Sequence, residues 1–188
     1  MTTSRITYHH GDLRQAVLAA ALDVIATEGP GALSLRDLAR RAGVSHAAPA
    51  HHFKDRTGLL TAIATEGYEL LAEALAGTPA LVDRGARYVG FAVAHPAHFQ
   101  VMFRPELLRA DDPELLAAKE HASAELRAGV ADLRGASDPR TAGIAAWSLA
   151  HGFATLLLSH NVDEAMGDRS PEAYFRELTA QLPPRERE

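Results

Sequence analysis

The sequence predicts an all-α fold, and three observations lead to this prediction. Its 188 residues include 37 Ala and 24 Leu, which favour helices, but only 9 Val and 4 Ile, which favour strands. Apolar residues recur at helical spacing, for example at Leu13, Val17, Ala21 and Val24. Proline, which the first turn of a helix tolerates, stands where each later apolar pattern begins.

Two helices are expected before the first glycine-containing turn. The first covers about residues 11–27 and ends at the sequence Glu-Gly-Pro-Gly, which breaks helices. The second begins at Ser34, because the sequence Ser-Leu-Arg-Asp has the spacing of a capping box. It ends near Gly43, which suits a left-handed C-cap.

Two more helices follow this turn. Ser45 is the expected N-cap of a short helix at residues 46–53, in which Pro49 removes about one backbone hydrogen bond near the first turn. Asp55 is the expected N-cap of a long helix at residues 56–75. This long helix is expected to connect the two halves of the chain.

Five further helices are expected, each at or next to a proline: 79–94, 97–103, 113–134, 139–160 and 171–182. The chain has no internal repeat and no low-complexity linker. We therefore predict two domains. Residues 11–71 form the first domain, with a helix-turn-helix at 34–53, and residues 78–185 form the second.

Composition excludes several classes of protein. Without cysteine, the chain forms no disulfide and no thiolate metal site. No strongly apolar run reaches the roughly 18 residues of a membrane span, and the N-terminus lacks the apolar stretch of a signal peptide. We therefore expect a cytoplasmic protein without a membrane partner.

The net charge of −5 is unevenly distributed. Residues 1–60 carry seven Lys or Arg and five Asp or Glu, whereas residues 61–188 carry twelve basic and nineteen acidic side chains. A mildly basic head on an acidic body fits a polyanion-binding module. An uneven solvated surface explains the charge about equally well.

The stretch AGVSHAAPAHHF, residues 42–53, suits close approach to DNA. In a helix-turn-helix the second helix enters the major groove, where small side chains can meet thymine methyl groups and histidines can donate to bases or phosphates. An ordinary turn between two packed helices is the alternative. Arg56 is a further phosphate candidate at the start of the long helix. The candidate DNA contacts are Ser34, Arg36, Ser45, His46, Ala47, Ala48, His51, His52 and Lys54.

The segment GALSLRDLARRAGVSHAAPAHHFKDRTGLLTAI resembles the N-terminal domain of the tetracycline-repressor (TetR/AcrR) family of transcriptional regulators. The resemblance covers about residues 11–71, and the Gly-Val-Ser turn, Phe53, Lys54 and Leu59-Leu60 fall in register. It implies a homodimeric repressor that a small apolar effector releases from a palindromic operator in double-stranded DNA. A helical small-molecule-binding or scaffold protein that has lost tight DNA binding is the alternative.

Two positions depart from the family pattern. Members usually have tyrosine where this chain has Ala50, and that tyrosine typically reaches a DNA phosphate. The resemblance therefore implies one phosphate contact fewer per subunit. Gly58 replaces the usual acidic residue in the cap of the long helix, which predicts a frayed start of that helix.

Residues 139–160 are apolar nearly all round, which predicts a helix covered on more than one side. Trp147, His151 and Gly152 resemble the Trp-His-Gly motif of a C-terminal domain in one TetR subgroup. This resemblance implies that the last two long helices form a four-helix bundle between two subunits. The central core helix of a monomer is the alternative. The expected dimer contacts are a ridge of small residues: Gly143, Ala146, Ala150 and Ala154.

A second apolar cluster lies in YVGFAVAHPAHFQVMF, residues 88–103. Aromatic walls with few polar groups suit a small-molecule pocket, although an ordinary core has the same composition. The family resemblance implies an effector cavity here. The candidate pocket residues are Phe91, His95, Phe99, Met102, Phe103, Trp147 and His151.

The sequence contains no motif for catalysis or for a cofactor. It lacks a Gly-rich phosphate loop, a Gly-x-Ser-x-Gly elbow and a paired-carboxylate pattern. His95 and His98 have a spacing that could ligate a metal, but no Asp, Glu or Cys accompanies them closely. We therefore expect solvated or capping histidines, no metal, no cofactor and no enzymatic activity.

Overall fold

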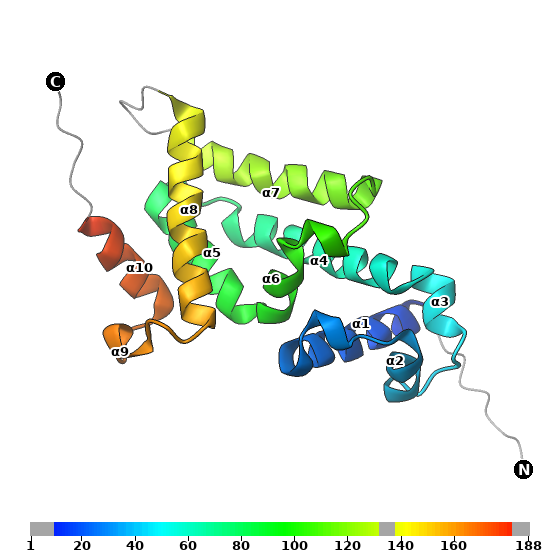
Figure 1. Ribbon diagram of the computed structural model, residues 1–188. Coiled ribbons are helices and arrows are strands. Elements are labelled where there is room, and N and C mark those ends of the chain that lie inside the picture. Colours follow the sequence, from blue (N-terminus) through cyan, green and yellow to red (C-terminus); the bar gives the residue numbers. More distant parts are fainter. Residues whose placement is uncertain (1–9, 132–137, 182–188) are drawn as a thin grey trace, which may run out of the picture. The chain divides into compact units, whose positions relative to one another are not determined.

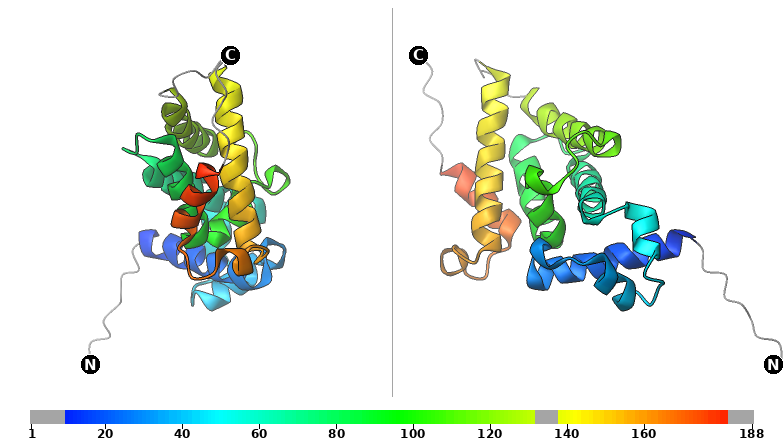
Figure 2. Two further views of the ribbon diagram at one scale, coloured as in Figure 1. Left: turned by 90° about the vertical axis from the view of Figure 1, so that its left-hand side faces the viewer. Right: turned by 45° about the vertical axis from the view of Figure 1, so that its right-hand side comes forward.

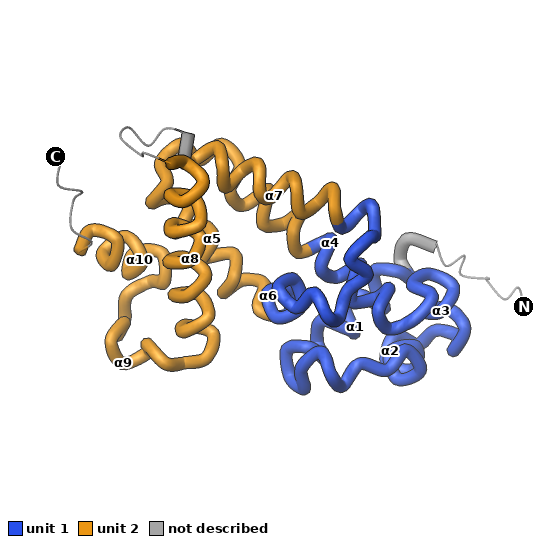
Figure 3. Tube along the Cα trace, turned by 45° about the horizontal axis from the view of Figure 1, so that its top comes forward, with its two compact units in different colours: residues 1–66, 97–115 blue, residues 67–96, 116–188 orange. Residues whose placement is uncertain are grey.

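Every regular element in the described residues is helical, as the sequence predicts (Figure 1). The computed structural model describes residues 10–131 and 138–181. The chain divides into two compact units, which Figure 3 shows in different colours. The first unit contains Met1–Glu66 and Ala97–Leu115, and the second contains Gly67–Pro96 and Leu116–Glu188. Residues 97–115 thus pack with the N-terminal helices.

Most helices begin and end within a few residues of the predicted bounds. The short elements η1, η2 and α9 were not predicted, because three or four residues are too few to show helical periodicity. In chain order the elements are α1 (His10–Glu28), η1 (Pro30–Ala32), α2 (Leu35–Arg41), α3 (Ala48–Phe53), α4 (Arg56–Leu75), α5 (Leu81–Ala94), α6 (Pro96–Met102), η2 (Pro105–Leu107), α7 (Pro113–Ala131), α8 (Pro139–Leu158), α9 (Asp163–Met166) and α10 (Pro171–Ala180).

In the first unit, α1, α2 and α3 pack around an apolar core to which α1 contributes Val17, Leu18 and Ile25. The Oγ of Ser34 accepts a hydrogen bond from the backbone N of Asp37 at 3.5 Å, so Ser34 is the N-cap of α2. Gly43 has a φ of 67°, the left-handed conformation. Both features confirm the predicted bounds of the second helix.

α3 begins later than predicted. Its N-cap is Ala47, which makes no side-chain cap hydrogen bond. Ser45 lies in the preceding turn, where its carbonyl oxygen accepts from the backbone N of Ala48 at 3.0 Å. The predicted cap at Ser45 is therefore wrong. Pro49 stands in the first turn of α3, where its fixed φ suits a helix and its missing N–H has no intrahelical partner to lose.

In the second unit, α5 contacts both α8 and α10 (Figure 2). Two glycines on α5 allow α10 to approach closely. A Cβ at Gly85 would lie 2.4 Å from Cε1 of Phe175, and a Cβ at Gly90 would lie 2.6 Å from Oε1 of Glu172. A side chain at position 85 would therefore collide with the buried Phe175 ring, whereas at position 90 the flexible Glu172 side chain would have to move.

The buried side of α8 corrects part of the predicted dimer ridge. Ala150 and Ala154 are only 3% and 0% exposed, because they face the interior of the second unit. A side chain buried in its own subunit offers no surface to a second copy. Gly143 and Ala146 are half-buried, and their part in a dimer remains a prediction.

Of the helices in the described residues, α8 alone is long and apolar enough to cross a membrane, judged by length and composition. One such helix is a weak indication, because core helices of soluble proteins have the same composition. α8 packs against α5 in the second unit. The absence of a membrane partner stays a prediction.

Arg84 joins three helices in the interior of the second unit. Its side chain is 7% exposed, and its Nη1 donates to the carbonyl oxygen of Leu75 at 3.4 Å, at the end of α4. The same Nη1 donates to the backbone carbonyl of Glu125 in α7 and lies 3.1 Å from the Oε2 of that residue. One nitrogen of the guanidinium therefore donates both to the carbonyl at the end of α4 and to the Glu125 carboxylate.

Replacing Arg84 with Met should lower the free energy of unfolding by about 2–4 kcal/mol, because it leaves a partly buried carboxylate and a carbonyl without their donor. Denaturant unfolding measures the loss. The matched control is Arg87→Met on the same helix, since the Nη1 of Arg87 donates to the carbonyl of Ala74 at 3.3 Å in an exposed contact. That change should cost less than about 1 kcal/mol. Equal losses in the two variants would contradict the role of Arg84.

Candidate nucleic-acid interface

α3 turns its apolar side chains inward and its small and imidazole side chains outward. Pro49 and Phe53, one helical turn apart, are buried. The guanidinium carbon of Arg14 in α1 lies 5.7 Å from the centre of the Phe53 ring. Ala48 and His52 are half-buried. The exposed residues of this segment include Ser45, His46, Ala47, Ala50 and His51.

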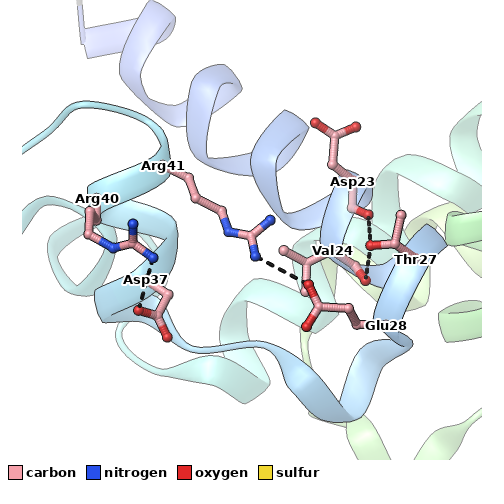
Figure 4. Close-up of polar contacts among 7 residues, drawn as sticks. All are labelled: Asp23, Val24, Thr27, Glu28, Asp37, Arg40 and Arg41. Atoms are coloured by element: carbon pink, nitrogen blue, oxygen red, sulfur yellow. Dashed lines mark hydrogen bonds and ion pairs between the residues drawn. The ribbon is translucent and has the colours of Figure 1, made fainter.

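The arginines of α2 differ in their partners. Arg40 pairs with Asp37 at 3.7 Å, and Arg41 pairs with Glu28 at 3.2 Å, both in exposed contacts (Figure 4). Arg36, which is exposed in the first turn of α2, has no ion pair within residues 10–131 and 138–181. Its charge therefore adds to the positive N-terminal end of α2, an arrangement that suits a phosphate.

The turn between α3 and α4 has an unusual backbone conformation. Lys54, the C-cap of α3, has a φ of 68° and a ψ of −60°. The backbone N of Asp55 donates to the carbonyl oxygen of Phe53 at 2.8 Å, which closes a γ-turn around Lys54. A non-glycine residue adopts this conformation only where surrounding contacts hold it.

Gly58 makes this turn possible. A Cβ at position 58 would lie 2.0 Å from the carbonyl oxygen of Phe53 and 2.7 Å from Nη1 of Arg109. The backbone N of Gly58 donates to Oδ1 of Asp55 at 2.8 Å, and Nη2 of Arg109 donates to Oδ2 at 2.8 Å. The Gly58 N–H, together with the Arg109 guanidinium, holds the pKa of Asp55 below its ordinary value.

These contacts correct two expectations for the start of α4. The predicted fraying at Gly58 is wrong, because Asp55 caps the helix and glycine is required there by packing. Arg56 is half-buried, and its Nη2 donates to the carbonyl oxygen of Pro30 at 2.6 Å. Arg56 therefore ties α4 to η1, and the expectation that it holds a phosphate is not supported.

In the second unit, Trp147 and His151 of α8 share a partner in α5. Nε1 of Trp147 lies 3.3 Å from the hydroxyl of Tyr88, and this hydroxyl lies 2.8 Å from Nδ1 of His151. The indole N–H can only donate, so the phenol oxygen accepts it. The phenol donates to Nδ1 of His151 in one tautomer of the imidazole and accepts from Nδ1–H in the other.

Burial favours the neutral forms in this group. It lowers the pKa of His151 and raises the pKa of Tyr88, and it raises the pKa of nearby Tyr68 to about 12. Tyr88 was not among the pocket residues predicted from the sequence. Its signal was its position, three residues before Phe91 and seven before His95, which places it on the same side of a helix as these two pocket candidates.

The other pocket candidates fall into two groups. Phe91 and His95, with ring centres 5.3 Å apart, belong to the second unit. Phe99 and Phe103, with ring centres 5.1 Å apart, belong to the first unit, as does the buried Met102. That all seven candidates line one cavity remains a prediction.

The histidines do not gather around a metal in the part of the chain that the structure describes, where no three His, Asp or Glu side chains form a ligand set. His98 differs from the expectation of a solvated or capping histidine. It is buried, and its Nε2 lies 3.4 Å from Oε2 of Glu66.

Two protein-family models match the chain. The model described as "Bacterial regulatory proteins, tetR family" matches residues 17–63, and the model described as "Tetracyclin repressor-like, C-terminal domain" matches residues 81–182. No curated protein matches the chain. The two matched segments contain the helix-turn-helix and the Tyr88, Trp147 and His151 group, respectively.

Solved structures have the same fold. The chain is similar to a protein with unknown function from Rhodococcus sp. RHA1, with 31% identity, coverage of 94% of this chain and 95% of that chain, and a TM-score of 0.73. A bacterial regulatory protein in the tetR family from Rhodococcus RHA1 has 22% identity, coverage of 90% and 96%, and a TM-score of 0.68. NalD, the secondary repressor of the MexAB-OprM multidrug efflux pump in Pseudomonas aeruginosa, has 23% identity, coverage of 90% and 93%, and a TM-score of 0.59.

Gly58→Ala should destabilise the first unit by about 1–3 kcal/mol, because the new Cβ would collide with the Phe53 carbonyl oxygen and force the backbone to shift. Alanine otherwise stabilises a helix relative to glycine, so the sign of the change is diagnostic. Denaturant unfolding gives this sign. Gly31→Ala is the matched control, since a Cβ there meets no atom within 4 Å. A Gly58→Ala variant more stable than the wild type would refute the close approach.

Proposed function

The chain belongs to the TetR family of bacterial regulatory proteins and is a DNA-binding transcriptional regulator; we propose that it is a homodimeric repressor that a small apolar effector releases from a palindromic operator. The family is one of bacterial regulatory proteins, and we propose that this chain is not an enzyme. We propose that it acts in the cytoplasm, where regulators of this family bind DNA, and that it has no membrane partner.

The outward face of α3 is the observation that carries the proposal. Ala47, Ala50 and His51 are exposed on this face, so the helix presents short side chains and an imidazole to the major groove. Arg36 and Lys54, both exposed, lie before and after this segment in the chain and supply phosphate contacts. Ser45, His46, Ala48 and His52 complete the proposed contact surface, with Ser34 at the N-terminus of α2.

Ala50 is the reason to test the alternative function, a small-molecule-binding or scaffold protein that has lost tight DNA binding. An alanine cannot make the phosphate contact that a tyrosine hydroxyl makes, so tight DNA binding must come from the other contacts. The discriminating experiment is a titration of the protein with the DNA that flanks its own gene. Specific binding at physiological salt supports the repressor. Binding that is weak and indifferent to sequence supports a small-molecule-binding or scaffold protein.

The effector proposal rests on the contacts among Tyr88, Trp147 and His151. These side chains combine aromatic surface with hydrogen-bonding groups, the combination that small-molecule sites use to fix orientation. We assign Trp147, His151 and Gly152 to the Trp-His-Gly motif and propose that the chain belongs to that subgroup. Effector and operator then weaken each other's binding by the same factor, because linkage is reciprocal.

We propose that α4 couples effector binding to operator binding. It is one continuous helix from Arg56 to Leu75 that contributes residues to both units. Its first turns carry the Asp55 and Gly58 contacts that hold α3. We propose that effector binding rotates α4 and changes the separation of the two α3 helices, which must be about 34–36 Å to read two half-sites.

The exposed side of α8 supports the dimer. Ile144 and Leu156 are 63% and 46% exposed, which is unusual for large apolar side chains on one helix. A Cβ at Gly152 meets no atom within 4 Å, so another helix could approach there. We propose that a second copy covers this side of α8, with α10 completing a four-helix bundle. Gly143 and Ala146 lie on the same side of α8 as the buried Ala150 and Ala154, and their part in a dimer remains a prediction.

Replacing Arg36 or Lys54 with Gln should weaken binding to all DNA sequences by a similar factor. Each change removes one phosphate contact, so the slope of log K against log salt should fall in magnitude by about 0.9 for each variant. Fluorescence anisotropy with specific and unrelated duplexes at several salt concentrations measures both effects. The control is Arg127→Gln on α7, far along the chain in the other unit. An unchanged slope in both test variants would remove these residues from the interface.

Leu156→Glu should separate the dimer, because a carboxylate in an apolar helix interface loses its hydration without gaining a partner. Sedimentation over a range of protein concentrations measures the association. The matched control is Leu116→Glu on α7, since Leu116 is 50% exposed in the single chain. The separated variant should also lose tight binding to a full palindrome, because the second half-site no longer binds at high effective concentration. A dimer that survives Leu156→Glu places the interface elsewhere.

A further inference from the structure

Arg109 contacts the turn between α3 and α4 from a distant part of the chain. It follows η2, within residues 97–115, which pack in the first unit. The C-terminal family model nevertheless covers this segment. In the chain, residues of the second unit precede and follow it. No motif in the sequence singles out Arg109.

Arg109 holds the first turns of α4 with both its backbone and its side chain. Its backbone N donates to Oγ1 of Thr61 at 3.0 Å, and the buried Thr61 hydroxyl donates to the carbonyl of Thr57 at 2.8 Å. Its Nη2 donates to Asp55, and its Nη1 lies 2.7 Å from the position of a Cβ at Gly58. The guanidinium thus fills the space that the missing side chain leaves.

Asp55 uses each carboxylate oxygen for a different partner. Oδ1 accepts from the backbone N of Gly58, and Oδ2 accepts from Arg109, each at 2.8 Å. The backbone N of Asp55 donates to the carbonyl of Phe53. One residue therefore joins the end of α3, the start of α4 and the guanidinium. A charge-assisted hydrogen bond restricts the direction of the carboxylate more than a neutral one does.

The γ-turn needs such support. The backbone of Lys54 has a φ of 68°, a value that residues other than glycine rarely adopt. Without the guanidinium, the Asp55 carboxylate would lose one partner and Gly58 would border an open space. The backbone at Lys54 could then relax to a negative φ, and α3 would change its direction relative to α4.

We propose that Arg109 is a positioning residue for DNA recognition, which fixes the direction of α3 through Asp55 and Gly58. This inference rests on the proposed DNA-binding function. Arg109 acts on DNA only through the turn and makes no phosphate contact. Any displacement of residues 97–115 therefore alters DNA reading without a change in α3 itself, and this segment is joined to the second unit at both of its ends.

The exposure of the pair separates this role from a general effect on stability. The side chains of Arg109 and Asp55 are 30% and 60% exposed. Ion pairs with such exposure contribute little to the free energy of unfolding. The loss of DNA affinity should therefore be much larger than any loss of stability.

The test compares Arg109→Gln with Arg109→Lys and with Arg104→Gln, whose exposed arginine precedes η2 in the same segment. Affinity for the DNA that flanks the gene is measured against salt concentration, and thermal unfolding is measured in parallel. We expect Arg109→Gln to weaken specific binding about tenfold or more with an unchanged salt slope. Arg109→Lys should restore part of the affinity, and Arg104→Gln should bind like the wild type.

Asp55→Asn and the double variant Asp55→Asn/Arg109→Gln complete the design. If both residues act through one contact, the affinity of the double variant for the specific DNA should be no lower than that of whichever single variant binds this DNA less tightly. A salt slope reduced by about 0.9 would make Arg109 a direct phosphate contact and overturn the proposal. Wild-type affinity in Arg109→Gln would also overturn it. A wild-type protein that binds no specific DNA would instead reject the proposed function.

Discussion

The carbonyl oxygen of Phe53 occupies the place where any side chain at position 58 would begin, and the DNA-reading end of the protein depends on this close approach. Glycine at 58 brings the end of α3 against the start of α4. The approach leaves Lys54 in a left-handed conformation and directs the Asp55 carboxylate toward the backbone N of Gly58. The contacts that hold α3 therefore lie at its C-terminal end, while Ala47, Ala50 and His51 remain exposed.

The first unit is completed by residues from the middle of the chain. Arg109 bonds to Asp55 and Thr61, and the buried His98 lies 3.4 Å from Glu66. Both contacts reach α4 from residues 97–115. A DNA-binding unit assembled from two chain segments can respond to whatever displaces the second segment. In the proposed function, this construction lets a displacement of residues 97–115 change the DNA-binding unit.

The second unit places polar groups inside an apolar helical layer. Arg84 and Tyr88, one turn apart on α5, are both buried. Arg84 finds acceptors on α4 and α7, whereas Tyr88 finds Trp147 and His151 on α8. A buried polar group stabilises only the arrangement that satisfies it, so these contacts specify how the helices pack. α8 keeps a second apolar side exposed, which fits the proposed contact with another copy.

The sequence by itself determined approximately where the longer helices begin and end. The cap at Ser34 and the prolines in the first turns act within three or four residues, so spacing along the chain is enough to find them. The helix-turn-helix could be recognised for the same reason. The bound of α3 was missed because a two-residue shift of a turn leaves little trace in a helix of six residues.

Only the tertiary structure decided which contacts form between distant residues. Arg109 and Asp55 are 54 positions apart, and Tyr88 and His151 are 63 apart, so no local spacing relates them. The sequence also could not predict which side of α8 is buried, for a different reason. A helix that is apolar nearly all round has no periodic contrast to identify the side that faces the core. Packing against α5 made that choice and buried Ala150 and Ala154, because their small side chains permit close contact between the two helices.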